Sequence, residues 1–453
     1  MRARGQGVLA AIVVAIVVAG AVTFERAVPL ERPAAGGGSA PSGSWVCPHG
    51  GGDGWEATVF LANPSPDPAA AHITSLALEG SSPPLVVDVP PTSTVRIQVD
   101  ATARGSATFV ETFGPWIAAG WVVRGSGDER GTGAEPCAPG GAREWYLADG
   151  STEEGEQTFV VVANPYAANA VVDVALFAKG RAPVRDSDIT NLTVPARGSV
   201  AVKMAKFAAG EPAIGAVVQA RIGRVGVGGL GVGASGIRST IGQTALAGRV
   251  ILPIAGALGE SSVEVFGPGE EAVAFGATYR SESEPELMQG LEQVEQDAQA
   301  AATYQVLTEG PSAVDLTVDN DQLVAAVLVA AGTKGDAAAT AGSPAGAAAW
   351  VVLPPVDADV ATSTIVLVNP GTEDADVTLE LLPASRGTST VTTITVPAGG
   401  VAASAPGSVE AGSAVVVRCE SGLVVALGAA TSGGGPDDEP AGYALSMGVR
   451  IPA

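Results

Sequence analysis

Histidine is scarce in this sequence, and its scarcity limits the chemistry that the side chains can perform. The 453 residues include two histidines, His49 and His72. His49 opens a His-Gly-Gly-Gly run, which resembles the oxyanion loop of some esterases. Such an enzyme also needs a serine in a Gly-x-Ser-x-Gly turn, and the chain contains no such pentapeptide. We therefore predict no catalytic residues and no enzymatic activity, and we interpret residues 49–52 as a turn.

Two glycine patterns match a dinucleotide-binding motif by spacing alone. Gly226, Gly228 and Gly231 satisfy Gly-x-Gly-x-x-Gly, and the pattern repeats from Gly231. A dinucleotide site needs a helix after the motif, because the pyrophosphate binds at the helix N-terminus. Here more glycine, serine and a strand-like run follow, so we predict a Gly-rich hairpin and no cofactor.

Metal ligation is not indicated either. The two histidines and three cysteines show none of the spacings typical of zinc sites. The oxygen-rich turn Asp319–Asp321 lacks the full run of ligands of a calcium loop. We predict no metal site.

Tryptophan is the residue type that leaves a binding function open. Trp55, Trp116 and Trp121 lie in the first third of the chain and are the candidate ligand-facing aromatics. Exposed indole rings provide large apolar faces with a polar edge, a combination suited to stacking on sugar rings. The alternative for each tryptophan is a place in the core.

The three cysteines, Cys47, Cys137 and Cys419, are compatible with an oxidising compartment. Cys47 and Cys137 bracket the first repeat described below, and we predict a disulfide between them. The alternative is that all three thiols are free and buried. Cys419 lies in a Val-rich run, where it is expected to act as a small apolar residue.

The N-terminus predicts the cellular compartment. Arg2 and Arg4 precede an apolar run from Val8 to Phe24, which favours an uncleaved membrane anchor over a cleaved signal peptide. We assign residues 1–28 to a cytoplasmic tip and transmembrane helix and residues 29–44 to a flexible tether. The positive-inside tendency then predicts a single-pass membrane protein whose C-terminal part is extracytoplasmic.

Internal repeats organise the remaining sequence. Residues 145–165 and 350–370 each open on a Trp and end on Asn-Pro, as do residues 45–64, whereas residues 250–268 lack the Trp and carry Gly267 in place of Asn. These repeats predict four modules at residues 45–142, 143–247, 248–345 and 346–453, the third of them degenerate.

Each module contains seven or eight short alternating segments with turn residues between them. This number of strands is typical of tandem immunoglobulin-like β-sandwich modules, and a β-propeller is the alternative. Residues 281–305 differ from the rest, because Leu287, Leu291 and Val294 recur at helical spacing. We predict an acidic helical insertion there, either packed on a sandwich edge or docking a partner.

Composition and charge exclude one class of partner. The net charge is −23, which repels nucleic acid phosphates. We predict no nucleic-acid binding.

The motif WYLADGST at residues 145–152, with VPARGS and STIG further along, resembles the WYLAEG-type repeat of exported actinobacterial surface proteins. The whole chain resembles an uncharacterised, membrane-anchored actinobacterial family of unknown function. This resemblance implies an extracytoplasmic β-rich protein and carries no functional residues. We therefore expect a non-enzymatic envelope protein that acts as a structural or interaction scaffold, and a cell-wall carbohydrate-binding protein is the alternative. The expected partners are the membrane, through the N-terminal helix, and an envelope protein or polysaccharide.

Overall fold

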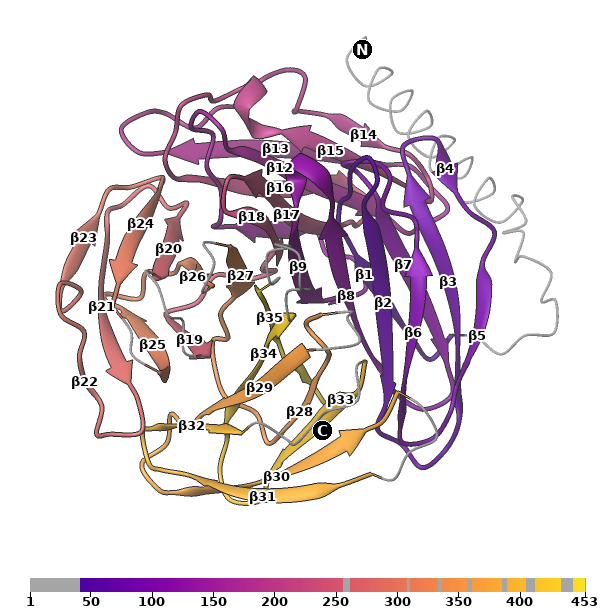
Figure 1. Ribbon diagram of the computed structural model, residues 1–453. Helices are drawn as coiled ribbons and strands as arrows, with labels where there is room; N and C mark the ends of the chain where they lie inside the picture. Colours follow the sequence, from indigo (N-terminus) through magenta and orange to yellow (C-terminus); the bar gives the residue numbers. More distant parts are fainter. Residues whose placement is uncertain are drawn as a thin grey trace, which may run out of the picture. The chain divides into compact units, whose positions relative to one another are not determined.

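The computed structural model describes residues 41–255, 261–307, 310–332, 336–356, 361–384, 389–404, 412–432 and 443–452. The predicted transmembrane helix and most of the predicted tether lie outside these residues. Within them the chain is built of short β-strands (Figure 1), and the two helices are three-residue 3-10 turns, η1 (Gly127–Glu129) and η2 (Met204–Lys206). None of the described helices is long and apolar enough to cross a membrane.

The strands follow the repeats of the sequence. The first module contains β1 (Gly43–Cys47), β2 (Glu56–Asn63), β3 (Ala69–Ala77), β4 (Gly80–Ser81), β5 (Leu85–Val89), β6 (Ser93–Val99), β7 (Ala107–Phe113), β8 (Ala118–Gly125), β9 (Gly131–Pro136) and β10 (Ala138–Pro139). The second contains β11 (Glu144–Leu147), β12 (Gln157–Asn164), β13 (Ala170–Ala178), β14 (Leu192–Val194), β15 (Gly198–Lys203), β16 (Ile214–Ile222), β17 (Gly226–Gly233) and β18 (Gly236–Ile241).

The third module contains β19 (Arg249–Ala255), β20 (Ser261–Gly267), β21 (Val273–Arg280), β22 (Glu286–Leu287), β23 (Val294–Gln296), β24 (Ala300–Val306), β25 (Pro311–Val318), β26 (Ala325–Ala331) and β27 (Ala337–Ala341). The fourth contains β28 (Ala349–Val352), β29 (Ala361–Val368), β30 (Ala375–Leu382), β31 (Val391–Val396), β32 (Val401–Ser404), β33 (Ala414–Cys419), β34 (Val425–Ser432), β35 (Tyr443–Met447) and β36 (Val449–Arg450).

All four modules share one topology of two antiparallel sheets. In the second module the sheets have the orders β11-β16-β13-β14 and β15-β12-β17-β18. The corresponding strands of the other modules are ordered in the same way, including those of the degenerate third module. Alternation along each strand supplies the core between the sheets: in β13, Val172, Val174 and Leu176 are buried, whereas the residues between them are half-buried.

The mostly-β prediction is confirmed, and two finer predictions are not. An immunoglobulin domain keeps its first two strands in one sheet, whereas here they lie in different sheets. The strand order is therefore not the immunoglobulin one. A β-propeller is not shown either, because each repeat has two packed sheets in place of one blade.

The predicted helix at residues 281–305 is wrong. The segment contains β22, β23 and most of β24, separated by turns. Pro285 and Gly290 interrupt it, and Gly290 adopts a positive φ of 83° that a helix does not use. Leu287 is 68% exposed whereas Leu291 is buried, so the leucines do not share one face.

Asparagine side chains fix the end of the second strand in three modules. The Asn164 amide donates to the carbonyls of Ala168, Val194 and Pro195 at 2.8 to 3.2 Å. Asn63 and Asn369 make the same three bonds in their modules. The Asn-Pro landmark therefore marks a buried polar clamp as well as a turn.

In the third module a different side chain lies at the end of the second strand. Gly267 replaces the asparagine, and the amide of Gln296 lies 4.0 Å from where a Cβ on Gly267 would be. Gln296 donates to the carbonyls of Val265 and Ala300. A side-chain amide is thus kept at this end of the module, although it comes from another strand and bonds to other carbonyls.

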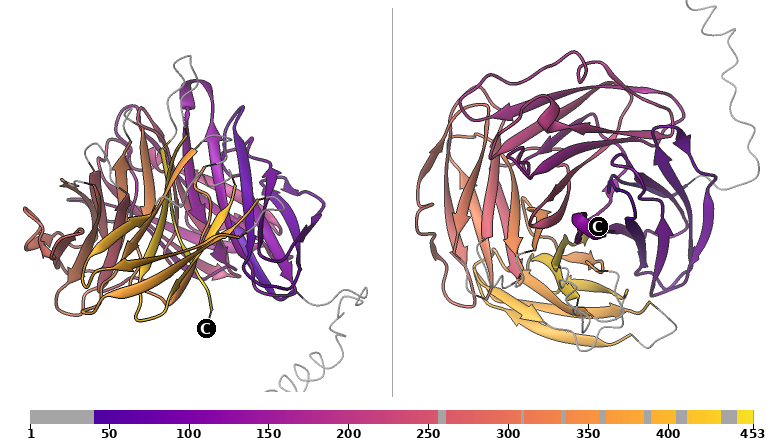
Figure 2. Two further views of the ribbon diagram at one scale, coloured as in Figure 1. Left: turned by 60° about the horizontal axis from the view of Figure 1, so that its bottom comes forward. Right: turned by 45° about the horizontal axis from the view of Figure 1, so that its top comes forward.

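The modules contact one another in a closed cycle. One sheet of each module ends in an edge strand, and β9, β18, β27 and β35 contact each other in this order, with β35 contacting β9 again. Figure 2 (right) shows the modules following one another around a ring, from indigo to yellow. Four sheet edges are thereby covered by protein.

Candidate functional site

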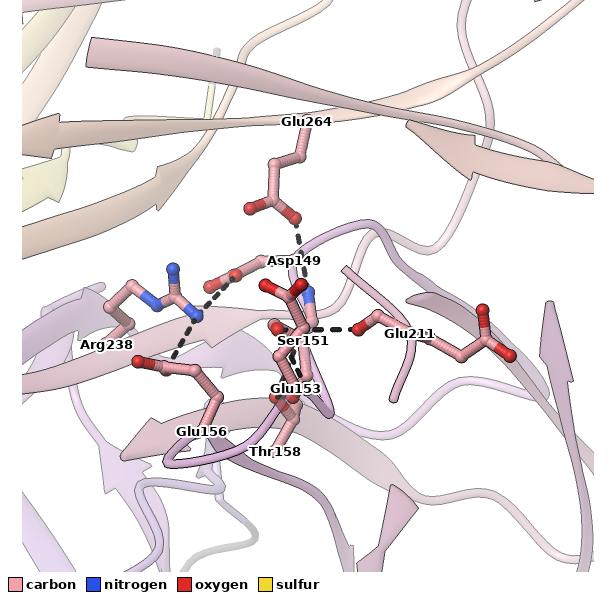
Figure 3. Close-up of polar contacts among 9 residues, drawn as sticks. Asp149, Ser151, Glu153, Glu156, Thr158, Glu211, Arg238 and Glu264 are labelled. Atoms are coloured by element: carbon pink, nitrogen blue, oxygen red, sulfur yellow. Dashed lines mark hydrogen bonds and ion pairs between the residues drawn. The ribbon is translucent and has the colours of Figure 1, made fainter. Parts of the chain in front are cut away.

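A group of buried and half-buried charges lies between the second and third modules, where it includes the Asp-Gly of the WYLADG motif (Figure 3). Asp149 and Gly150 follow β11, Arg238 comes from β18, and Glu264 reaches across from β20 of the third module. We name Asp149, Glu156, Arg238 and Glu264 the Arg238 cluster.

Local hydrogen bonds hold the loop that carries Asp149. The Ser151 amide donates to Thr158 Oγ1 at 3.0 Å, and that hydroxyl donates back to the Ser151 carbonyl at 2.7 Å. The Thr152 amide donates to the Glu211 carbonyl. Gly150 is needed here because a Cβ at this position would lie 2.6 Å from the Ile214 carbonyl oxygen. The motif glycine therefore allows close backbone packing beside the charges.

Arg238 is shared by two carboxylates of its own module. Its Nη2 lies 3.7 Å from Asp149 Oδ1 and 3.7 Å from Glu156 Oε2. These are ion-pair distances that exceed a direct hydrogen bond. In the part of the chain that the structure describes, Nη2 and Asp149 Oδ1 have no hydrogen-bond partner. Charge attraction, and not direct hydrogen bonding, therefore holds Arg238 beside Asp149 and Glu156.

Glu264 completes the cluster from the neighbouring module. Its Oε2 accepts a hydrogen bond from the Gly150 amide at 3.2 Å, and the residue is 5% exposed. Burial raises the pKa of Glu264 from 4.5 to about 8, and the Asp149 charge adds to this effect, while Arg238 and the Gly150 amide oppose it. The Asp149 charge raises the pKa of Arg238 above its usual value. Burial and the neighbouring Asp149 charge therefore favour the protonated form of Glu264.

A carboxyl that titrates near neutrality has the pKa of a general acid or base. Glu264 is enclosed between two modules, however, and exchanges its proton where no substrate can approach it. The geometry is that of an electrostatic link between modules two and three.

A second buried carboxyl, Glu135 of β9, lies where the four edge strands meet. Its Oε1 accepts the Ala341 amide of β27 at 2.9 Å, and the Ile241 amide of β18 and the Met447 amide of β35 face the same carboxyl and favour its charged form. These three residues hold the same position in their strands, and in β9 that position is Pro136, which has no N–H. One carboxyl of the first module therefore faces an amide from each of the other three and bonds to that of Ala341.

The electrostatics of Glu135 follow from its position. The residue is fully buried, and burial raises its pKa well above the ordinary value, while the donated amides offset part of that effect. Its second oxygen, Oε2, has no partner among the described residues.

The His-Gly-Gly-Gly run is buried, and several of its polar groups are hydrogen-bonded within the first module. His49 is fully buried, its Nδ1 donates to the Gly50 carbonyl at 2.7 Å, and its Nε2 accepts from Thr108 Oγ1 at 3.0 Å. Burial lowers its pKa to about 4. The amides of Gly50 and Gly52 donate to the Ser106 and Ala101 carbonyls. These two amides are therefore not free to form an oxyanion hole.

Two of the three candidate aromatics do not face a ligand. Trp55 is 5% exposed and carries the Arg104 guanidinium 5.0 Å from its ring centre. Trp121 is 1% exposed and donates to Ser239 Oγ at 3.2 Å. Trp55 packs in a cluster with residues of the second module, and Trp121 packs in a cluster of the first and fourth modules while bonding to Ser239 of the second.

Trp116 is half-buried and lines a pocket. Its ring meets that of Trp45 nearly edge-on, with centroids 6.0 Å apart. The pocket has a volume of about 430 Å³, and Ser42, Ser44, Thr112 and Pro139 also contribute to its walls.

The cysteines and the Gly-x-Gly-x-x-Gly motif lie in or beside β-strands, where they contribute to packing. A disulfide joins Cys47 of β1 to Cys137, and Cys419 is a half-buried free thiol in β33. The Gly-rich run forms β17, which pairs with β18 in a hairpin. A Cβ on Gly226 would lie 2.4 Å from Val46 of the first module, so glycine there permits the contact between modules.

Sequence reasoning missed the Arg238 cluster and Glu135. Glu264 interrupts a Val-rich strand, and Glu135 lies between alanine and proline in a strand end. A lone charge inside a buried strand is the available signal, because such a charge needs a partner. The partners lie in other modules, and the sequence does not place them.

A match to a protein-family model is consistent with the predicted resemblance to an uncharacterised family. The WYLAEG-type repeat and the actinobacterial origin stay predictions. No curated protein matches the chain. A family model covers residues 106–351, which is more than half of the chain and includes the Arg238 cluster and Glu135. On this match, and with the β-rich modules described above, the chain belongs to DUF5719, a family of unknown function.

Proposed function

We propose that this chain is a non-enzymatic, extracytoplasmic protein of the cell envelope, anchored by its N-terminus, in which the four modules form one scaffold. The apolar run Val8–Phe24 supports the anchor, and the bond between Cys47 and Cys137 supports an oxidising compartment. The scaffold role is supported by how the modules are joined.

Each junction between modules carries a polar link, which is buried at three junctions and partly buried between modules three and four. Ser199 Oγ donates to the Leu76 carbonyl between modules one and two, and Gly150 donates to Glu264 between modules two and three. Arg280 donates to the Gly399 carbonyl between modules three and four, and Thr94 Oγ1 donates to the Leu382 carbonyl between modules four and one. Hydrogen bonds need defined geometry, so these links fix how neighbouring modules are oriented.

The single observation that carries the proposal is Glu135, a fully buried carboxyl of the first module that bonds to the Ala341 amide of the third module and faces one amide from each of the other two. Flexibly strung modules have no need of such a group. A ring fixed at its centre presents its outer surfaces at constant spacing, which is what a scaffold for other envelope components requires.

Differential scanning calorimetry of Glu135→Ala tests the scaffold. Removing the acceptor leaves the buried Ala341 amide unsatisfied, at a cost of about 1 to 3 kcal/mol, and removes the group that the Ile241 and Met447 amides face. We expect wild type to unfold in one main transition, and the variant to unfold earlier and in separate steps. Asp128→Ala, an exposed carboxylate in the connection before β9, is the matched control. A variant that unfolds like wild type removes the basis for a scaffold closed at its centre.

Thiol trapping in intact cells tests the compartment. We expect a maleimide reagent to label Cys47 and Cys137 after reduction and not before, and deletion of residues 1–24 to move the protein to a soluble fraction. Free thiols at both positions, or a full-length chain found in the cytosol, would contradict the proposed location.

A further inference from the structure

The pocket beside Trp116 has the composition of a small-ligand site. Trp116 follows the turn between β7 and β8, and its ring and that of Trp45 form the apolar part of the wall. Trp45 is 5% exposed and belongs to the core, whereas Trp116 is half-buried. The core thus supports one indole that reaches the surface, which limits the conformational freedom lost on binding.

The polar part of the wall consists of hydroxyl groups. Ser42 Oγ donates to the Thr112 carbonyl at 3.0 Å, a bond that leaves the oxygen able to accept from a ligand. Ser44 Oγ lies 3.7 Å from where a Cβ on Gly140 would be. Gly114 and Gly140 adopt positive φ angles of 97° and 72° and expose the pocket floor without side chains.

Charge and size narrow the ligand class further. No residue that lines the pocket carries a charged side chain, although the chain as a whole has a net charge of −23. A charged ligand would lose hydration on entering without gaining a counter-charge. A volume of about 430 Å³ falls within the ordinary range for small-molecule pockets and suits one or two sugar rings.

We infer that this pocket binds a neutral saccharide, which stacks on Trp116 and exchanges hydrogen bonds with the hydroxyls of Ser42 and Ser44. An aromatic face beside neutral hydroxyls matches the two kinds of surface that a sugar ring presents, apolar C–H groups and O–H groups. The inference deepens the proposed scaffold function by naming a polysaccharide as the envelope component at the first module.

The experiment is titration of the full chain with a panel of neutral oligosaccharides, namely glucose, galactose, mannose and N-acetylglucosamine oligomers, followed by tryptophan fluorescence and calorimetry. We expect at least one to bind wild type and to shift the fluorescence. Trp116→Ala should weaken that binding about tenfold or more, as the loss of a central aromatic anchor does, and Trp116→Phe should retain part of it. Leu85→Ala, which removes an exposed apolar side chain of the same module that does not line the pocket, is the control and should bind like wild type.

Two results would overturn the inference: no member of the panel binds wild type, or Trp116→Ala binds as wild type does. Binding of a proline-rich peptide at Trp116 in place of any sugar would also overturn the saccharide assignment. None of these results affects the disulfide or the calorimetric transitions, so failure of this inference is distinguishable from failure of the proposed scaffold.

Discussion

Replacing Glu264 by glutamine should remove a large part of the pH dependence of stability. The pKa of this carboxyl is about 8 in the folded chain against an ordinary 4.5. Below pH 4.5 the group is protonated whether the chain is folded or not, so its full contribution is present. Between these two values the unfolded chain releases a proton that the folded chain keeps, so stability falls as pH rises through the folded pKa.

The magnitude follows from the difference between the two pKa values. The difference between 4.5 and about 8, at 1.36 kcal/mol for each pH unit, gives a loss of at most about 5 kcal/mol by pH 9 and about 3 kcal/mol by pH 7. Glutamine does not ionise, and its carbonyl can still accept from Gly150. The Glu264→Gln variant should therefore resemble wild type at pH 5 and exceed its stability at pH 9.

Urea unfolding at pH 5, 7 and 9, followed by tryptophan fluorescence with the disulfide intact, measures this difference. Glu154→Gln removes an exposed carboxylate from the loop beside the cluster and serves as the control. It should leave the pH dependence of wild type unchanged. A Glu264→Gln curve that runs parallel to that of wild type over the whole range would refute the reasoning, because it would mean that Glu264 ionises alike in both states.

Three further predictions concern the first two modules. The pKa of His49 is lowered to about 4, so neutral His49 stabilises the folded chain above pH 6.5. This stabilisation is lost as pH falls towards 4, by up to about 3 kcal/mol. Acid titration of His49→Gln, followed by circular dichroism, should show a smaller loss of stability than wild type. Removal of the bond between Cys47 and Cys137, which are 90 residues apart, should cost about 2 to 4 kcal/mol in urea unfolding, and an unchanged midpoint would show that the crosslink is not limiting. Asn164→Ala should cost about 2 to 4 kcal/mol because it orphans buried carbonyls, whereas Asn169→Ala, at an exposed turn, should cost far less in the same assay.

Repetition made the strands and the modules predictable. The Trp and Asn-Pro landmarks located the first and second strands, and the third module has the shared topology although it lost both. Strand partners were harder, because alternation shows which residues are buried and not which strand lies alongside. That is why the immunoglobulin order was expected and a different one is found.

The helix that we expected at residues 281–305 shows that a few apolar residues at helical spacing are weak evidence for a helix. Three apolar residues at helical spacing outweighed Pro285 and Gly290, which break a helix. The Arg238 cluster was beyond reach for another reason: Asp149 and Glu264 are 115 positions apart, and their contact depends on how one module packs on the next.

The convergence on Glu135 also has a consequence for biosynthesis. Met447, whose amide faces this carboxyl, lies in β35, so the carboxyl gains its full set of neighbours only when β35 has been made. A chain that emerges from its N-terminus must therefore hold the first three modules with open inner edges until β35 has been made. Contacts so distant in sequence form slowly, and exposed strand edges invite wrong pairing in the meantime. The arrival of β35, and any escort that shields the inner edges beforehand, thus becomes the step at which this protein matures or aggregates.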